Sequence, residues 1–170
     1  MSATTAIRTN EERVSAPVQR EDVAEPSSGA RGIQSVTRLN AALALLRVVT
    51  GVVFIAHGGQ KIFTWTLPGV TEAFAGMGIP LAGVTAPLVS LLEFFGGMAL
   101  VLGLFTPVVA AGLAAVMAGA IVMVHLPAGF FLPDGIEFTL TLFATSVALA
   151  LAGPGEYSVD RVLARRRSNR

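Results

Sequence analysis

The sequence contains no cysteine among its 170 residues. This absence excludes disulfide bonds, thiol catalysis, iron–sulfur clusters and cysteine-ligated zinc. A redox function would therefore need a bound cofactor or another subunit. The sequence also has no glycine-rich phosphate loop and no HExxH segment, so two common kinds of nucleotide and zinc site have no motif here.

Charge is scarce as well: 14% of the residues are charged and 53% are hydrophobic, which is more apolar than a typical soluble domain. A helix that crosses a bilayer core of about 30 Å needs roughly 20 apolar residues. Four such runs are present, at about 40–63, 83–104, 107–126 and 136–153. Small residues within these runs favour close helix packing in lipid. The sequence therefore predicts an all-α fold, a four-helix transmembrane bundle.

Basic residues gather before the first run and at the C-terminus, whereas the loops at 64–82 and 127–135 contain no lysine or arginine. The positive-inside rule then places both termini in the cytoplasm. We expect a disordered cytoplasmic extension at 1–36, a membrane domain at 37–156 and a basic cytoplasmic tail at 157–170. The extension has no apolar stretch typical of a signal peptide, so the first span should act as an uncleaved anchor. The tail suits anionic lipid better than nucleic acid.

Two of the loops have distinct properties. The 64–82 loop is moderately apolar and interrupted by glycine and proline, so it could lie along the outer interface or fold back as a cap, with Trp65 at headgroup depth. The 103–107 loop predicts a tight turn, because Gly103 can end one helix and Pro107 suits the first turn of the next.

The first span carries a polar stripe. Residues at spacings of three and four share one face of a helix, and here they are Arg47, Thr50, Phe54, His57 and Lys61. An ionisable side chain in the membrane costs about 2.5–3.5 kcal/mol unless it is paired or hydrated. We therefore expect the stripe to face the interior of the bundle and to find a partner there.

Glu93 is the only acidic residue in the middle of a span. If each span starts at its membrane boundary, Arg47 and Glu93 differ in depth by about 5 Å, which a guanidinium can reach. The sequence predicts an Arg47–Glu93 ion pair. Such a pair could be functional, or it could merely fix the helix register.

Further polar residues lie near helix ends that face the same, outer boundary: His57, Gln60, Lys61, His125 and Glu137. We expect them to converge on one outward-facing pocket, although Lys61 could reach headgroups and His125 could simply cap its helix. Haem ligation by the two histidines is disfavoured, because their expected depths differ and no second-shell acceptor can be named. Metal-ligand spacing is absent, so no metal site is predicted. No catalytic residue is assigned.

These residues resemble those of the DoxX family of bacterial membrane proteins. The resemblance covers about 40–163 and rests on three motifs: Arg47-x3-Gly51-x2-Phe54-x2-His57-Gly58-x2-Lys61, Glu93-x2-Gly96-Gly97 with Gly103, and Gly153-Pro154-Gly155-x2-Ser158-x-Asp160. It implies a multi-pass protein of the bacterial inner (plasma) membrane and oxidoreductase assemblies, some linked to quinone and others to redox stress. Arg47, His57, Lys61 and Glu93 occupy the family's polar positions.

Three functions are compatible with the sequence. The first is a membrane-associated oxidoreductase subunit whose polar pocket binds a quinone, since imidazole, ammonium and carboxylate groups can serve the quinone oxygens and their protons. The second is a non-enzymatic scaffold that recruits cytosolic redox partners through the tails. The third is a small-solute or proton carrier, which the lack of an obvious inverted repeat disfavours. The expected partners are membrane lipid and cytosolic or membrane redox proteins, a homo-oligomer stays open, and no nucleic acid is expected.

Overall fold

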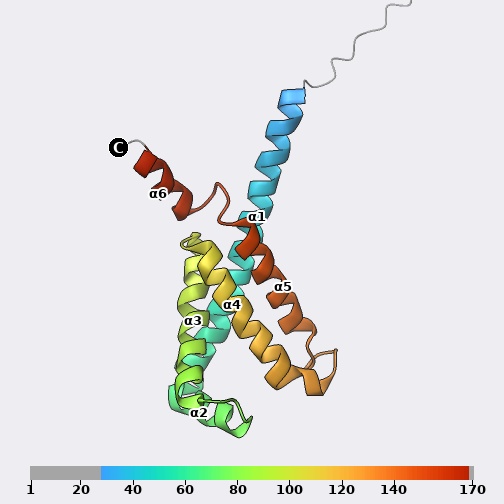
Figure 1. Cartoon of the computed structure of the whole chain (residues 1–170), viewed down its shortest axis with the longest axis vertical. Helices are drawn as coiled ribbons and strands as arrows, with labels where there is room; N and C mark the ends of the chain where they lie inside the picture. Colours follow the sequence, from blue (N-terminus) through green and yellow to red (C-terminus); the bar gives the residue numbers. More distant parts are fainter. Residues whose placement is uncertain (1–27, 169–170) are drawn as a thin grey trace, which may run out of the picture.

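The computed structural model describes residues 28–168, and every regular element in this range is helical (Figure 1). The helices are α1 (Ser28–Gly59), α2 (Thr66–Gly76), α3 (Ala82–Leu102), α4 (Thr106–Ala120), α5 (Glu137–Ala152) and α6 (Val159–Ser168). Two π-helical turns, η2 (Gln60–Thr64) and η3 (Ile121–His125), prolong α1 and α4, and one 3-10 turn, η4 (Leu126–Ala128), follows η3.

Three helical segments are long and apolar enough to cross a membrane: Gln34–Thr64, Ala82–Leu102 and Thr106–Ala128. They confirm the first three expected spans. The fourth expected span is helix α5, which has 16 residues and is therefore about 24 Å long at 1.5 Å per residue. This length is less than a bilayer core of about 30 Å. A four-span topology thus remains a prediction.

The boundary of the N-terminal extension was predicted wrongly. Helix α1 begins at Ser28, so residues 28–36 belong to a helix and not to a disordered segment. The chain has no proline between Pro26 and Pro68, and a helix that forms in the apolar span can therefore continue toward the N-terminus. Residues 1–27 of the expected extension and 169–170 of the expected tail lie outside the described residues.

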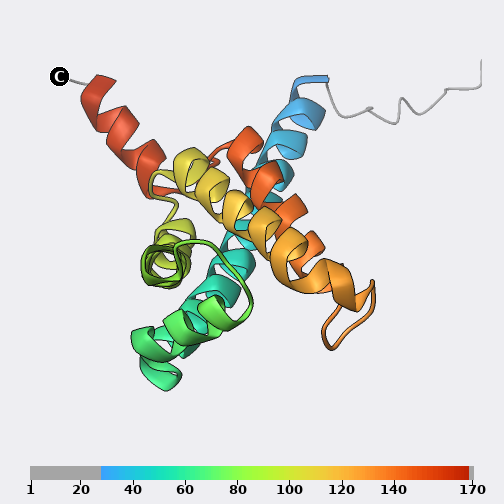
Figure 2. The same cartoon turned by 60° about the horizontal axis from the view of Figure 1, so that its bottom comes forward.

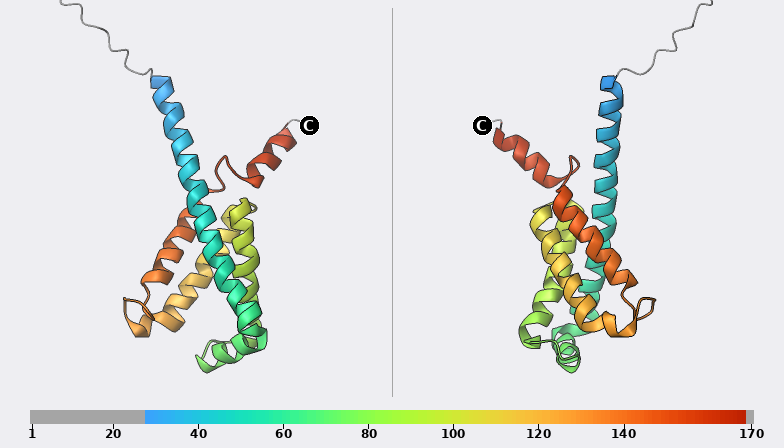
Figure 3. Two further views of the ribbon diagram at one scale, coloured as in Figure 1. Left: turned by 180° about the vertical axis from the view of Figure 1, so that it is seen from behind. Right: turned by 45° about the vertical axis from the view of Figure 1, so that its right-hand side comes forward.

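The bundle is organised around two closely packed helix pairs, α1 with α3 and α4 with α5. Helix α1 runs between α3 and α5 (Figure 3, left). The most deeply buried large side chains come from four of the helices and fill the centre: Phe54, Leu100, Leu113 and Leu149. The two ends of the described chain, the start of α1 and helix α6, lie at the same end of the molecule (Figure 1). Their placement in the cytoplasm stays a prediction.

Glycines bring α1 and α3 into backbone contact. A Cβ at Gly51 would lie 2.7 Å from the carbonyl oxygen of Gly97, and a Cβ at Gly97 would lie equally close to that of Gly51. About two turns farther along α1, a Cβ at Gly58 would lie 2.4 Å from the amide nitrogen of Phe94. Only residues without a side chain allow this approach, which is how helices associate tightly in lipid. These contacts fix the register of α1 against α3.

The connections around α3 place the helices that enclose the site. Gly103 ends α3 at a φ of 70°, and Pro107 lies in the first turn of α4, so the expected tight turn is confirmed. From this turn α3 and α4 diverge (Figures 1 and 2). At their far end, the 64–82 segment folds back as helix α2 and packs against α3. The fold-back of this segment onto α3 is confirmed, and its position along the outer interface stays a prediction.

Candidate functional site

A buried ion pair joins α1 to α3. The ammonium group of Lys61 donates a hydrogen bond to Oε2 of Glu93, whose side chain is 3% exposed, against 15% for Lys61. Lys61 lies on the π-helical turn η2 at the end of α1.

The predicted Arg47–Glu93 pair is not formed, because the glycine contacts set a different register. With Gly51 against Gly97 and Gly58 against Phe94, Lys61 comes level with Glu93. Arg47 lies 14 positions earlier on α1, about 21 Å away along the axis. It therefore lies near the opposite end of α3.

Arg47 forms hydrogen bonds with the segment that follows α5. Its guanidinium donates hydrogen bonds to the carbonyl oxygens of Pro154 and Tyr157, and the residue is 3% exposed. Gly103 makes room for it, since a Cβ there would lie 2.5 Å from Nη1 of Arg47. Arg47 is therefore paired with backbone carbonyl oxygens after α5, and it lies far from the Lys61–Glu93 pair.

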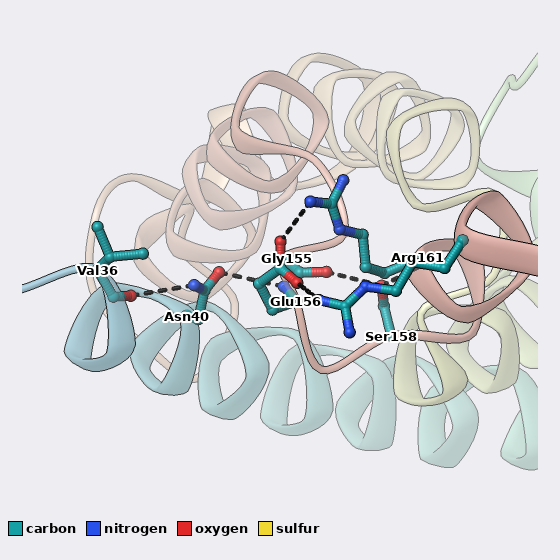
Figure 4. A network of polar contacts seen from close by, with 7 residues as sticks. Val36, Asn40, Gly155, Glu156, Ser158 and Arg161 are labelled. Atoms are coloured by element: carbon teal, nitrogen blue, oxygen red, sulfur yellow. Dashed lines mark hydrogen bonds and ion pairs between the residues drawn. The ribbon is translucent and has the colours of Figure 1, made fainter. Parts of the chain in front are cut away.

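Residues 153–160, which we call the strap, connect three helices at this end of the bundle. The carboxylate of Asp160 accepts hydrogen bonds from the amides of Phe105 (2.9 Å) and Thr106 (3.1 Å) at the start of α4. The amide of Glu156 donates to Oδ1 of Asn40 on α1 at 3.1 Å (Figure 4). The strap contains the third DoxX-like motif, and Arg47 and Gly103 belong to the other two. Residues of all three motifs, which are far apart in the sequence, therefore contact one another at the strap.

Two cavities adjoin the Lys61–Glu93 pair, and the larger of the two has a volume of about 710 Å³ and lies between α3 and α4, with α2 along one side. Its walls are mainly apolar and include Phe74, Leu88, Leu92, Val116 and Met123. Gly112 and Gly119 of α4 leave room along one wall. Polar side chains gather where α1 meets α3: His57, Lys61 and Glu93. Trp65 and Thr85 also line this cavity.

A smaller cavity of about 120 Å³ lies on the side of α5 and is lined by the same three polar residues, together with Thr139. The ring of His57 lies against Phe138 of α5, with 5.7 Å between the ring centroids. His57, Lys61 and Glu93 thus form part of the wall of both cavities, and we call them the polar triad. His57 is the exposed member, whereas the stripe faces the interior at Arg47, Thr50 and Phe54 and, through its ion pair with Glu93, at Lys61.

The remaining outer-pocket candidates lie elsewhere. Nδ1 of His125 is 2.8 Å from the carbonyl oxygen of Asp134, and a carboxylate oxygen of Glu137 accepts a hydrogen bond from the amide of Leu132 at 2.8 Å. Both contacts hold the connection between α4 and α5, so His125 contacts the carbonyl oxygen of Asp134 in the following loop and does not cap its own helix. Gln60 is exposed. None of these three residues lines either of the two cavities.

Comparisons with known proteins identify the family of the chain. A family model described as DoxX matches residues 42–126, which include α1 beyond its first turns, α2, α3 and α4. The chain belongs to the DoxX family. All four residues of the expected intramembrane site lie within the DoxX match: Arg47, His57, Lys61 and Glu93.

Three bacterial proteins are similar to this chain over about two thirds of its length or slightly more. The protein of Bacillus subtilis (strain 168) named "Putative oxidoreductase CatD" is 34% identical over 116 residues, which is 68% of this chain and 82% of the relative. The "Uncharacterized membrane protein Rv3486" of Mycobacterium tuberculosis is 33% identical over 71% of this chain and 80% of the relative. The "Inner membrane protein YqjF" of Escherichia coli is 33% identical over 69% and 88%. No solved structure matches the chain significantly. The DoxX membership and the apolar helices make the chain a multi-pass membrane protein.

Sequence reasoning expected a pocket formed by polar residues at the helix ends, but it did not foresee that the cavity beside the triad is mainly apolar and lies between α3 and α4. The cavity depends on α2 folding back and on Gly112 and Gly119, two glycines of α4 spaced seven apart. That spacing was the signal available in the sequence, because two glycines on one face of a helix leave a groove. Asp160 was noted only as part of a motif, and its function as a cap for α4 depends on the tertiary structure.

Proposed function

We propose that this DoxX protein is the membrane subunit of an oxidoreductase system and that its larger cavity binds a quinone. The observation that carries the proposal is the placement of the polar triad at the edge of an apolar cavity. A volume of about 710 Å³ falls within the usual range for small-molecule sites, about 300–1,000 Å³. Mostly apolar walls with a few polar groups at one place are typical of such sites.

The residues present fit the two parts of a quinone. The apolar walls formed by α2, α3 and α4 suit an isoprenoid tail, while the ammonium of Lys61 and an N–H of His57 can donate hydrogen bonds to the ring oxygens. Glu93 orients Lys61 through their ion pair, so the donor is held in place before a ligand arrives. His57, which is exposed, can exchange a proton with its surroundings. The quinone would supply the two-electron redox chemistry.

The electrons would come from a protein partner, because the chain has no cysteine that could donate them. The name of the B. subtilis relative contains the word oxidoreductase, and this agrees with a redox assembly. We propose a membrane or cytosolic redox protein as that partner, with defence against redox stress as the setting.

Trp65 offers a direct test of quinone binding. It is the only tryptophan of the chain and it lines the cavity, so a quinone bound there should quench its fluorescence. We expect saturable quenching when the protein, in lipid nanodiscs, is titrated with short-chain ubiquinone or menaquinone analogues. His57→Ala and Glu93→Gln should each weaken binding by roughly tenfold or more, the effect of losing or misplacing a hydrogen bond to a charged group.

Gln60→Ala is the matched control, because Gln60 is exposed beside Lys61 and lines neither cavity. Its titration should match that of the unmodified protein. Quenching that rises linearly without saturation, and equally in all variants, would show partition of the quinone into lipid and would refute the proposal.

A scaffold without redox chemistry is the second candidate, and helix α6 favours it. This helix carries exposed arginines at the end of the bundle that holds the strap. On this alternative the Lys61–Glu93 pair would only stabilise the fold. The triad variants would then lose thermal stability with no change in quinone binding, and removal of residues 159–170 would abolish recovery of a redox partner in a pull-down.

A further inference from the structure

We propose that helix α6 lies in the membrane–water interface and binds the headgroups of anionic phospholipids. This interaction surface is separate from the quinone cavity and independent of the proposed redox function. Three kinds of observation carry it: an exposed apolar face, two arginines beside that face, and the anchoring of the helix next to apolar residues at the end of the bundle.

The apolar face begins in the first turn of α6. Val159, Val162 and Leu163 are spaced three and four apart and therefore share one side of the helix. They are 38%, 50% and 43% exposed, and Tyr157 just before the helix is 56% exposed. Side chains of this kind on a short basic helix favour a position at the boundary between headgroups and acyl chains.

The arginines divide into two sets. Arg161 and Arg165 turn back to Glu156 and form ion pairs with it, the first at 2.8 Å (Figure 4). Arg166 follows Val159 by seven positions and Val162 by four, so it continues the apolar face toward the C-terminus, and Arg167 flanks it. Long basic side chains in this arrangement bury their aliphatic stems while their charged ends reach phosphate groups. This charge pattern selects an anionic lipid surface.

The anchoring of α6 brings this face to the lipid boundary. Asp160 fixes the first turn of the helix to the amides at the start of α4. The turn between α3 and α4 exposes Leu102, Phe105 and Val108, at 56%, 66% and 74%. In a spanning hairpin such side chains contact the acyl chains. Helix α6 therefore starts where the bundle meets the edge of the bilayer.

A spin label can test this proposal with little background, because the chain has no native cysteine. Leu163→Cys places a nitroxide on the apolar face, and Ala164→Cys places it about 100° around the helix as the matched control. The full chain is reconstituted in nanodiscs of phosphatidylcholine alone or mixed with phosphatidylglycerol. Accessibility to oxygen and to a nickel chelate then reports the depth of each label.

We expect the label at position 163 to be accessible to oxygen and shielded from the nickel chelate when phosphatidylglycerol is present, and the label at 164 to remain accessible to the chelate. In the Leu163→Cys background, Arg166→Gln with Arg167→Gln should lower the ratio of docked to undocked helix roughly thirtyfold, since each basic residue contributes about a factor of five at an anionic surface. Arg31→Gln with Arg38→Gln removes the same charge from α1 and should leave the ratio nearly unchanged.

A label at 163 that is open to the chelate in both lipids would overturn the proposal. Equal shielding in the two lipids would also overturn it, since anionic headgroups would then have no part in docking. Shielding that appears only when a cytosolic protein fraction is added would overturn it in favour of a protein partner.

Discussion

The Lys61–Glu93 pair leads to a quantitative prediction for Lys61→Met. This change removes the cation and leaves the carboxylate of Glu93, which is 3% exposed, buried without its partner. Breaking a buried pair in this way costs about 3–5 kcal/mol, whereas replacing both partners by apolar residues is often nearly neutral. We expect Lys61→Met to lower the free energy of unfolding by about 3–5 kcal/mol. The double variant with Glu93→Met should recover most of this loss.

The measurement is a double-mutant cycle on reversible unfolding in bicelles. Contacting charged residues give coupling free energies of about 0.5–3 kcal/mol, and this pair should lie at or above the upper end, because the second change recovers most of a loss of about 3–5 kcal/mol. The matched control is the cycle that combines Arg47→Met with Glu93→Met, which should be additive within about 0.5 kcal/mol because these residues are far apart. A coupling below about 0.5 kcal/mol for Lys61 and Glu93 would refute the pairing.

Three further predictions concern the packing and the strap. Gly97→Ala should reduce thermal stability strongly, because the new Cβ would lie 2.7 Å from the carbonyl oxygen of Gly51; an unchanged melting temperature would argue against the close approach of α1 and α3. Asp160→Asn should cost about 0.5–2 kcal/mol in the same unfolding assay, since α4 loses a charged cap at its first amides. The hydrogen bond from Arg161 lowers the pKa of Glu156 below its ordinary value of 4.5. The stabilisation that this carboxylate provides is therefore present above about pH 4.5, and it is lost as the pH falls through the lowered pKa. Glu156→Gln should therefore flatten the fall in melting temperature on acidification, and a fall as steep as in the unmodified protein would contradict this assignment.

The helices could be predicted from the sequence because hydropathy decides them locally. Long apolar runs with few charged residues are sufficient to indicate membrane spans, and Gly103 and Pro107 mark the turn between two of them. Helix α5 shows where this reasoning is limited. Its composition is apolar, but its ends at Glu137 and Ala152 give a length that hydropathy alone does not fix.

The pairing of the charged residues could not be predicted from depth estimates. The estimate for Arg47 and Glu93 assumed that each helix starts at a membrane boundary, so a shift of a few residues in either start changes the expected partner. The actual register comes from backbone contact at Gly51 and Gly97, which is a tertiary property. The residue types of the site were therefore predictable, whereas the choice of Lys61 as the partner was not.

The position and the apolar lining of the cavity could not be predicted from the sequence either. Its lining nevertheless provides a direct test of quinone binding. Gly119 of α4 lines the cavity, and a Cβ built there meets no described atom within 4 Å; Gly83 of α3 is equally open but does not line the cavity. Gly119→Leu should thus fill part of the cavity without disturbing the fold, and Gly83→Leu is its matched control. Both changes replace glycine in a helix, so neither should lower stability.

The measurement that tests the central claim most directly is the quinone titration of Trp65 fluorescence in these two variants. The account predicts that Gly119→Leu abolishes saturable quenching or weakens it severalfold, while Gly83→Leu binds quinone as the unmodified protein does. Saturable quenching of equal affinity in all three proteins would contradict a quinone site in this cavity.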